Sequence, residues 1–146
     1  MKSTCGIRLF VYPDDYPAVH ALWEIAGPGL HVGRSDSPQE ILKKIQRDPD
    51  LFLVAEIDGQ IVGTVIGGFD GRRGMVYHLG VLPEYRRSGI GRALMAEVES
   101  RLQRKGCLKG YLMVVEDNDA AHFYEACGWK IQNVQLFAKE FITTLR

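Results

Sequence analysis

The residues best suited to chemistry form a glycine-containing loop, Arg86-Arg87-Ser88-Gly89-Ile90-Gly91, directly before an amphipathic run. The first amides of a helix lack intrahelical acceptors, and the helix dipole adds partial positive charge at that end. Both effects stabilise a bound phosphate. Gly89 and Gly91 have no side chain that would hold a phosphate away from these amides. Arg86 and Arg87 add positive charge, so we interpret the loop as a cradle for phosphate groups.

The spacing of this loop excludes two other phosphate-binding motifs. A dinucleotide fingerprint requires a third glycine where this chain has Leu94, and no Gly-Lys-Ser/Thr triplet of a P-loop occurs. Between Arg72 and Arg92 there are five arginines and one acid, Glu84, whereas the whole chain balances 18 basic against 18 acidic residues. This distribution favours a small anionic ligand near the loop over a polyanion such as nucleic acid.

Three runs of strand type precede the loop. Leu51 to Ile57 and Gln60 to Phe69 are separated by Asp58-Gly59, a pair favoured in two-residue hairpins because both central positions need positive φ. Met75 to Val81 follows after a glycine-rich connection. Because this third run ends just before the loop, we expect a strand, the phosphate loop and a helix to form one unit.

Helical periodicity continues from Gly89 to Lys105, without proline and with Gly106 directly after it. The remaining elements are expected from apolar periodicity, caps and turn residues. In chain order they are a strand at Ile7 to Val11, a helix from Asp14 or Asp15 to Gly27, a helix capped by Ser37 and ended by Asp48-Pro49, a strand at Tyr111 to Val115, a helix at Ala120 to Cys127 and a final strand at Lys130 to Ala138.

This order predicts an α+β fold with three layers, α/β/α. One central mixed, mostly antiparallel twisted sheet is expected with flanking helices. A right-handed crossover through the helix at Gly89 to Lys105 would make its two flanking strands parallel neighbours. The 146 residues fit a single domain spanning residues 1–146.

Composition narrows the classes of protein and site. Cys5, Cys107 and Cys127 are odd in number and lack a C-x-x-C spacing, which argues against a disulfide framework and a structural zinc site. The histidines have no metal-ligand spacing, so we expect no metal. No apolar run resembles a signal peptide or a membrane span. We expect a soluble, cytoplasmic protein with no membrane partner.

Two motifs carry a resemblance to a known family. The first is Val81-x-Pro83-Glu84-Tyr85-Arg86-x-x-Gly89-x-Gly91, and the second is Asn118-x-x-Ala121-x-x-Tyr124-Glu125-x-x-Gly128-Trp129. The first resembles the acyl-CoA signature of the GNAT acetyltransferase superfamily, and the second is similar to its carboxy-terminal pattern, with Trp129 where phenylalanine is commoner. The likeness covers nearly the whole chain and is closest to the small bacterial YpeA-like branch.

The resemblance implies an N-acetyltransferase that moves an acetyl group from acetyl-CoA to a primary amine by direct attack in a ternary complex. It implies a strand that separates from its neighbour at a bulge, for which Gly80 is suited. Val81 would donate its backbone N–H to the oxyanion, and Tyr124 would be the general acid. The cofactor-binding residues implied are Leu79, Gly80, Val81, Arg86, Arg87, Ser88, Gly89, Ile90, Gly91, Arg92, Asn118 and Tyr124.

The general base and the acceptor stay open at this stage. Where many relatives place a glutamate, this chain has Met75 and Met113. The remaining candidates for the base are Glu56, Asp70, His78 and Glu116. We expect acceptor specificity in residues 14–47 and 69–74, acetyl-CoA and an amine as partners, no nucleic acid, and leave a homodimer open. The alternatives are a catalytically silent acyl-CoA-binding module and a nucleic-acid-binding domain using the basic stretch from Arg72 to Arg92.

Overall fold

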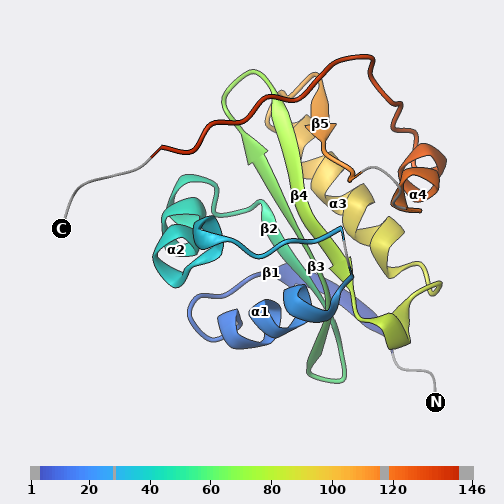
Figure 1. Cartoon of the computed structure of the whole chain (residues 1–146). Coiled ribbons are helices and arrows are strands. Elements are labelled where there is room, and N and C mark those ends of the chain that lie inside the picture. Colours follow the sequence, from blue (N-terminus) through green and yellow to red (C-terminus); the bar gives the residue numbers. More distant parts are fainter. Residues whose placement is uncertain (1–3, 28, 116–118, 142–146) are drawn as a thin grey trace.

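The computed structural model describes residues 4–27, 29–115 and 119–141. Its strands are β1 (Cys5–Leu9), β2 (Phe52–Ile57), β3 (Gln60–Phe69), β4 (Gly74–Val81) and β5 (Gly110–Leu112). Its helices are α1 (Tyr16–Ile25), α2 (Pro38–Arg47), α3 (Ile90–Arg104) and α4 (Ala120–Ala126), with single 3-10 turns at η1 (Arg34–Asp36) and η2 (Pro83–Tyr85). Figure 1 shows these elements in sequence colours.

One sheet holds the strands in the order β1-β2-β3-β4-β5. The first three pairings are antiparallel, and β4 pairs with β5 in parallel across the crossover through α3. Asp58 and Gly59 connect β2 to β3 with φ values of 50° and 79°, as a two-residue hairpin requires. The predicted mixed, mostly antiparallel sheet is therefore confirmed.

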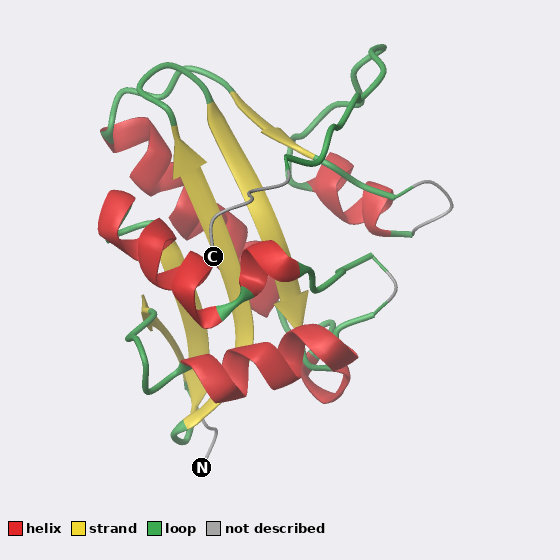
Figure 2. Cartoon of the chain, turned by 60° about the vertical axis from the view of Figure 1, so that its left-hand side comes forward, coloured by secondary structure: helices red, strands yellow, loops and turns green. Residues whose placement is uncertain are grey.

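Helices cover both faces of this sheet (Figure 2). A Cβ added at Gly67 of β3 would lie 2.7 Å from Val98 of α3. A Cβ added at Gly80 of β4 would lie 3.1 Å from Ala26, at the end of α1. Glycines in the central strands thus let a helix approach the sheet closely on each side, and the predicted α/β/α layering is confirmed.

The start of α1 differs from the expected cap. Asp15 precedes the helix, but its carboxylate makes no side-chain cap bond. It accepts hydrogen bonds from the Arg8 guanidinium at 2.7 Å and from the Val11 N–H at 2.8 Å. The bond from Arg8 holds the pKa of Asp15 below its usual range, and the bond from Val11 adds to this effect. A charged partner from β1 has replaced the local cap, because a charge-assisted bond is stronger than a neutral one. In contrast, Ser37 caps α2 as predicted, accepting the Glu40 N–H at 3.4 Å.

The final strand predicted at Lys130 to Ala138 is wrong. Residues 130–141 have no strand geometry, and their side chains are exposed. The segment runs across to η1, where Arg34 contacts the Glu140 carboxylate at 3.3 Å and the Phe141 carbonyl oxygen at 2.9 Å. An alternating pattern indicates a strand only where a partner edge pairs with it, and in the described part of the chain none does so.

Candidate active site

Strand β4 separates from β5 before it reaches the loop. Their parallel pairing joins Gly74, Met75 and Val76 to β5, and the remaining residues of β4, 77–81, have no β5 partner in the described ranges. An unpaired strand edge presents N–H and C=O groups that can bind an extended ligand. The splayed strand expected from the sequence is present, and its open edge leads directly to residues 86–91.

A bulge lies in the same strand. Gly80 pairs with Thr64 of β3 and Tyr77 pairs with Ile66, so two residues, His78 and Leu79, face one residue of β3. His78 has φ of 50°, in the left-handed region. The bulge is therefore two residues earlier than the glycine that suggested it. Gly80 has another role, because a Cβ there would lie 3.0 Å from Leu30 and 3.1 Å from Ala26.

The predicted phosphate loop has the geometry of an anion cradle. Gly89 adopts φ of 88° at the start of α3, and its carbonyl accepts the Ala93 N–H at 3.0 Å. The N–H groups of Ile90, Gly91 and Arg92 therefore precede the first intrahelical bond and are free to point at a ligand. Apart from its own segment of chain, no described residue has an atom within 4 Å of a Cβ built on Gly89. These open amides fit the pyrophosphate of CoA.

The two loop arginines behave differently. Arg86 donates from Nε to the Val81 carbonyl at 3.2 Å and from its guanidinium to the Ala26 carbonyl. It thus ties the loop to the end of β4 and to the end of α1. Arg87 has φ of 63°, and its side chain is exposed. The Arg92 side chain is also exposed. The Ser88 hydroxyl donates to the Tyr85 carbonyl and braces the loop.

Helix α4 joins this site through an aromatic residue that sequence reasoning missed. A Cβ on Gly91 would lie 3.3 Å from the Phe123 ring and 3.8 Å from the Val81 side chain. The missing side chain at Gly91 therefore admits Phe123 beside the end of β4. The Phe123 ring lies 5.2 Å from the Tyr124 ring, at an angle of 76°. Phe123 directly precedes the motif tyrosine, which is the only local signal that could have indicated it.

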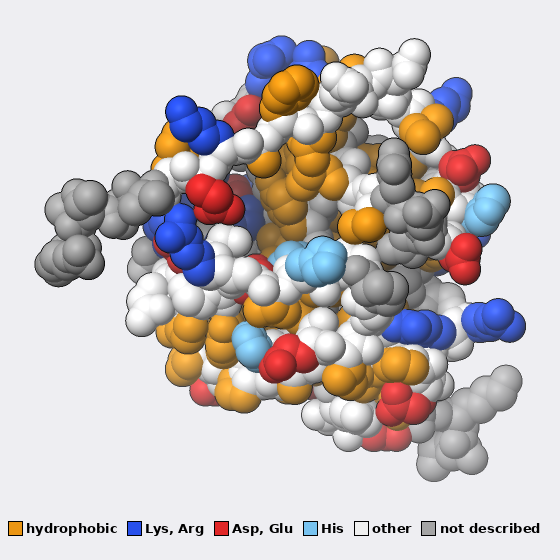
Figure 3. All heavy atoms as spheres, in the orientation of Figure 1, with side chains coloured by type: hydrophobic (Ala, Val, Ile, Leu, Met, Phe, Trp, Pro, Cys, Tyr) orange, Lys and Arg blue, Asp and Glu red, His pale blue; other side chains and the backbone are white. Residues whose placement is uncertain are grey.

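Tyr124 lies in a groove with residues of β4, β5 and the C-terminal segment, including Met75, Tyr111 and Leu136. Figure 3 shows a hollow with apolar walls on this face of the molecule. Burial, with a smaller contribution from Cys127, raises the pKa of Tyr124 to about 12. Its hydroxyl therefore stays protonated at neutral pH, which is the state a proton donor needs.

The candidates for the general base differ in what their side chains contact. Glu56 binds Arg8 at 2.9 Å, and Asp70 accepts the N–H groups of Arg72 and Arg73 at 2.7 Å in the β3–β4 turn. Both carboxylates have structural partners. His78 lies on the β4 bulge, with Nε2 2.9 Å from Asp36. Glu116 and the predicted cofactor ligand Asn118 lie outside the described residues.

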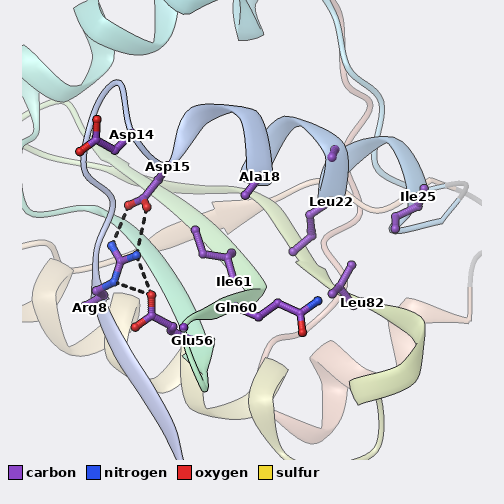
Figure 4. A pocket seen from close by; sticks show the side chains of 12 residues that line it. Arg8, Asp14, Asp15, Ala18, Leu22, Ile25, Glu56, Gln60, Ile61 and Leu82 are labelled. Atoms are coloured by element: carbon purple, nitrogen blue, oxygen red, sulfur yellow. Dashed lines mark hydrogen bonds and ion pairs between the residues drawn. The ribbon is translucent and has the colours of Figure 1, made fainter.

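A second pocket lies away from the loop (Figure 4). Arg8 pairs with Asp15 and Glu56 at one end of this pocket, at 2.7 Å and 2.9 Å, and the apolar side chains of Leu22 and Ile25 on α1 line its other end. Each charged group in this network has an oppositely charged partner. We therefore interpret the network as a structural link between β1, β2 and the start of α1. Within residues 4–27, 29–115 and 119–141, no cluster of three His, Cys, Asp or Glu side chains could hold a metal. None of the described helices is long and apolar enough to cross a membrane.

Sequence comparisons give one consistent result. Residues 16–129 match the Acetyltransferase (GNAT) family. The chain is 50% identical over 114 residues to an acetyltransferase of Pectobacterium atrosepticum, covering 78% of this chain and 79% of the relative. It is 43% identical over 137 residues to an acetyltransferase of Yersinia pseudotuberculosis, covering 93% of this chain and 95% of that one.

Solved structures resemble the fold closely. Ard1 from Thermoplasma volcanium superposes with a TM-score of 0.72 at 27% identity, covering 88% of this chain and 84% of the other. The aminoglycoside N-acetyltransferase AAC(6′)-Iy, in complex with CoA, gives a TM-score of 0.73 at 18% identity and covers 96% and 97% of the two chains. At that lower identity the likeness concerns the fold alone.

Proposed function

This chain belongs to the GNAT acetyltransferase family and depends on acetyl-CoA, and from this premise we propose that it acetylates a primary amine by direct attack in a ternary complex. One observation carries the proposal: the open edge of β4 leads to the free amides that begin α3. An extended ligand that ends in a pyrophosphate could bind along the strand edge and place its phosphates on these amides. The family resemblance inferred from the two motifs is confirmed by the bacterial relatives.

We assign the cofactor site to two adjacent segments. Leu79, Gly80 and Val81 would bind the amides of the pantetheine arm along the open edge, with the Val81 N–H directed at the thioester oxygen. The pyrophosphate would lie on the loop and the first turn of α3. The residues proposed there are Arg86, Arg87, Ser88, Gly89, Ile90, Gly91 and Arg92, and Asn118 stays a proposed ligand of the cofactor arm.

Tyr124 is the proposed general acid. Acetyl-CoA supplies the thioester, and its sulfur leaves as a thiolate that must gain a proton. The Tyr124 hydroxyl is protonated because its pKa is raised to about 12. It also lies on α4 directly beside Phe123, whose ring contacts the first turn of α3. Its support is therefore both its protonation state and its position near the cofactor loop.

The acceptor would approach from the side of α1, η1 and α2. The expected specificity segments, residues 14–47 and 69–74, contain α1, η1 and α2 and the turn between β3 and β4, and connecting segments commonly determine specificity. Basic side chains at Arg72 and Arg73 stand in the second of these segments. They would favour an acceptor that carries a carboxylate or another anionic group.

Thiol release from acetyl-CoA, measured over a panel of amines, polyamines, amino acids and peptide amino termini, tests the proposed activity. We expect at least one acceptor class to give saturable turnover that depends on both substrates. Tight acetyl-CoA binding without turnover on any acceptor would instead identify a silent binding module. Salt-dependent binding to nucleic acid without acetyl-CoA binding would overturn the proposal altogether.

A further inference from the structure

The bulge of β4 carries a histidine that the proposed cofactor site does not use. His78 has φ of 50° and stands opposite β3 together with Leu79, directly before the residues assigned to the pantetheine arm. Left-handed backbone is uncommon for a residue with a side chain and is frequent at functional sites. The bulge turns the imidazole toward α1 and η1, the side from which the acceptor would approach, as its contacts with both elements show.

Asp36 of η1 holds this imidazole. Its Oδ1 lies 2.9 Å from His78 Nε2, and its Oδ2 accepts the Gly33 N–H at 2.9 Å. The Asp36 side chain is only 8% exposed, and the Tyr16 hydroxyl donates to the Asp36 backbone carbonyl at 2.6 Å. Both carboxylate oxygens therefore have a partner, His78 on β4 and the Gly33 N–H just before η1, and Tyr16 of α1 holds the backbone of the same residue. Trp23 completes the setting, because its ring lies edge-on to the imidazole with the centroids 4.9 Å apart.

This arrangement selects one tautomer of the imidazole. An ionised carboxylate only accepts hydrogen bonds, so Nε2 must carry the proton that it shares with Asp36. The lone pair then lies on Nδ1, which makes no hydrogen bond within the described part of the chain. The His78 side chain is 20% exposed, so solvent or a small ligand can reach it.

We propose that His78 is the general base of the acetyl transfer and that Asp36 is its positioning residue. The inference rests on the proposed function and assigns the one role that the sequence motifs leave empty. His78 precedes Val81 by three residues, which would be about 10 Å in a fully extended strand and is less across the bulge. The side chain of His78, the acceptor amine and one water span that distance, and a base acting through one water is effective.

The proton balance of the step is complete. His78 Nδ1 takes one proton from the acceptor ammonium, which frees the nitrogen lone pair to attack the thioester carbon. The new C–N bond forms, the C–S bond breaks, and the departing thiolate takes a proton from the Tyr124 hydroxyl. The nitrogen loses its second proton, which restores Tyr124. His78 then releases its proton to solvent, so the products are the acetylated amine, CoA thiol and one proton.

Other titratable groups on the elements around the imidazole need to be separated from it. Tyr16 and His20 belong to α1, and the His20 ring lies 6.5 Å from the Trp23 ring. Asp36 is the charged group in direct contact with His78. A single substitution at His78 leaves these neighbours in place. A change in the pH–rate profile of that variant can therefore be assigned to His78.

The decisive variant is His78→Asn, because asparagine tolerates positive φ and so preserves the bulge. With an acceptor found for the wild-type enzyme, we expect kcat/KM to fall about 100-fold or more, with acetyl-CoA affinity unchanged by calorimetry. The acidic limb of the pH–rate profile should disappear, and added imidazole should restore part of the rate. His122→Asn, which removes an exposed histidine of α4, is the matched control and should retain wild-type kinetics.

Asp36→Asn provides a second variant in case His78→Asn does not fold. We expect it to lower kcat about tenfold with little change in KM and to move the acidic limb of the profile. A histidine with a packing role only would lower Tm in both variants but leave the pH profile unchanged and give no imidazole rescue, and that result would overturn the assignment. If the wild-type enzyme turned over no amine, the proposed function would fail before this question arose.

Discussion

The proposed cofactor side and the proposed acceptor side of β4 consist of different chemical groups. On the cofactor side, the proposed site consists of backbone N–H groups, Gly89 and Gly91, and the residues involved lie within a few positions of one another. On the acceptor side, His78 is held by Asp36, 42 residues earlier in the chain. The first site follows from local backbone geometry, whereas the second exists only once η1 and α1 pack on the sheet.

This difference explains why a short spacing motif indicates the proposed cofactor side, whereas no spacing in the sequence indicates the contact between His78 and Asp36. A glycine at positive φ and a helix start have a fixed local spacing. A histidine–aspartate contact has no fixed spacing, because it depends on how two distant segments meet. Arg86 joins the two sides, since its guanidinium binds the Val81 carbonyl at the end of β4 and the Ala26 carbonyl at the end of α1.

The largest effect that would sharpen the comparison is expected for Tyr124→Phe. Removing the hydroxyl of the proposed acid should lower kcat about 100-fold while leaving acetyl-CoA affinity unchanged. Because burial raises the pKa of Tyr124 to about 12, the wild-type rate should show no loss from tyrosine ionisation up to about pH 10. Steady-state kinetics over that pH range, with Tyr12→Phe as a control outside the proposed site, provide the measurement. Equal kcat in Tyr124→Phe and the wild type would remove Tyr124 from the mechanism.

A smaller effect distinguishes the two loop arginines. Arg87→Ala should weaken acetyl-CoA binding about tenfold without changing Tm, because it removes a charge from an exposed side chain. Arg86→Ala should weaken binding similarly and also lower Tm, because it releases the loop from β4 and α1. Calorimetric titration and thermal melts of both variants compare the two directly. An Arg86→Ala protein with unchanged Tm would mean that the bonds from Arg86 to β4 and α1 do not stabilise the fold.

The smallest effect on activity is expected at the ion-pair network below α1. Asp15→Asn should lower the free energy of unfolding by about 1 kcal/mol at pH 7, with acetyl-CoA affinity unchanged. Because the folded-state pKa of Asp15 is lowered, its contribution is present above the unfolded-state pKa and is lost as the pH falls through the folded-state pKa. Urea unfolding at pH 7 and pH 3 should therefore show a difference between the two proteins that shrinks in acid. A difference that grew in acid would contradict this assignment.

Much of the fold could be predicted because its signals are local. The Asp58-Gly59 hairpin and the Ser37 cap have the geometry that their residues favour. The cap at Asp15 could not be predicted, because Arg8 competes for the same carboxylate through a tertiary contact. The strand expected at residues 130–138 is missing for the same reason, since pairing depends on which edge the segment reaches.

The candidate site also has parts that the sequence predicted and parts that it did not. The loop before α3 follows from motif spacing and the separation of β4 from β5 from the family resemblance, and the described structure contains both. The role of Tyr124 stays a prediction. Gly80 was interpreted as the bulge, but it accommodates α1, and the bulge falls on His78. Phe123 and Asp36 act through contacts with Gly91 and His78 that no local pattern encodes.

A calorimetric titration with acetyl-CoA tests the cofactor site most directly, using Gly89→Ala against Gly59→Ala. Both glycines have positive φ, 88° and 79°, and an added Cβ would meet no atom within 4 Å from the described residues beyond their own segments, so both substitutions strain the backbone similarly. We predict one-to-one binding to the wild type and to Gly59→Ala, and binding at least about tenfold weaker to Gly89→Ala, whose new methyl group would face the proposed pyrophosphate site. Equal affinity in all three proteins, or no binding to the wild type, would contradict the location of the cofactor on this loop.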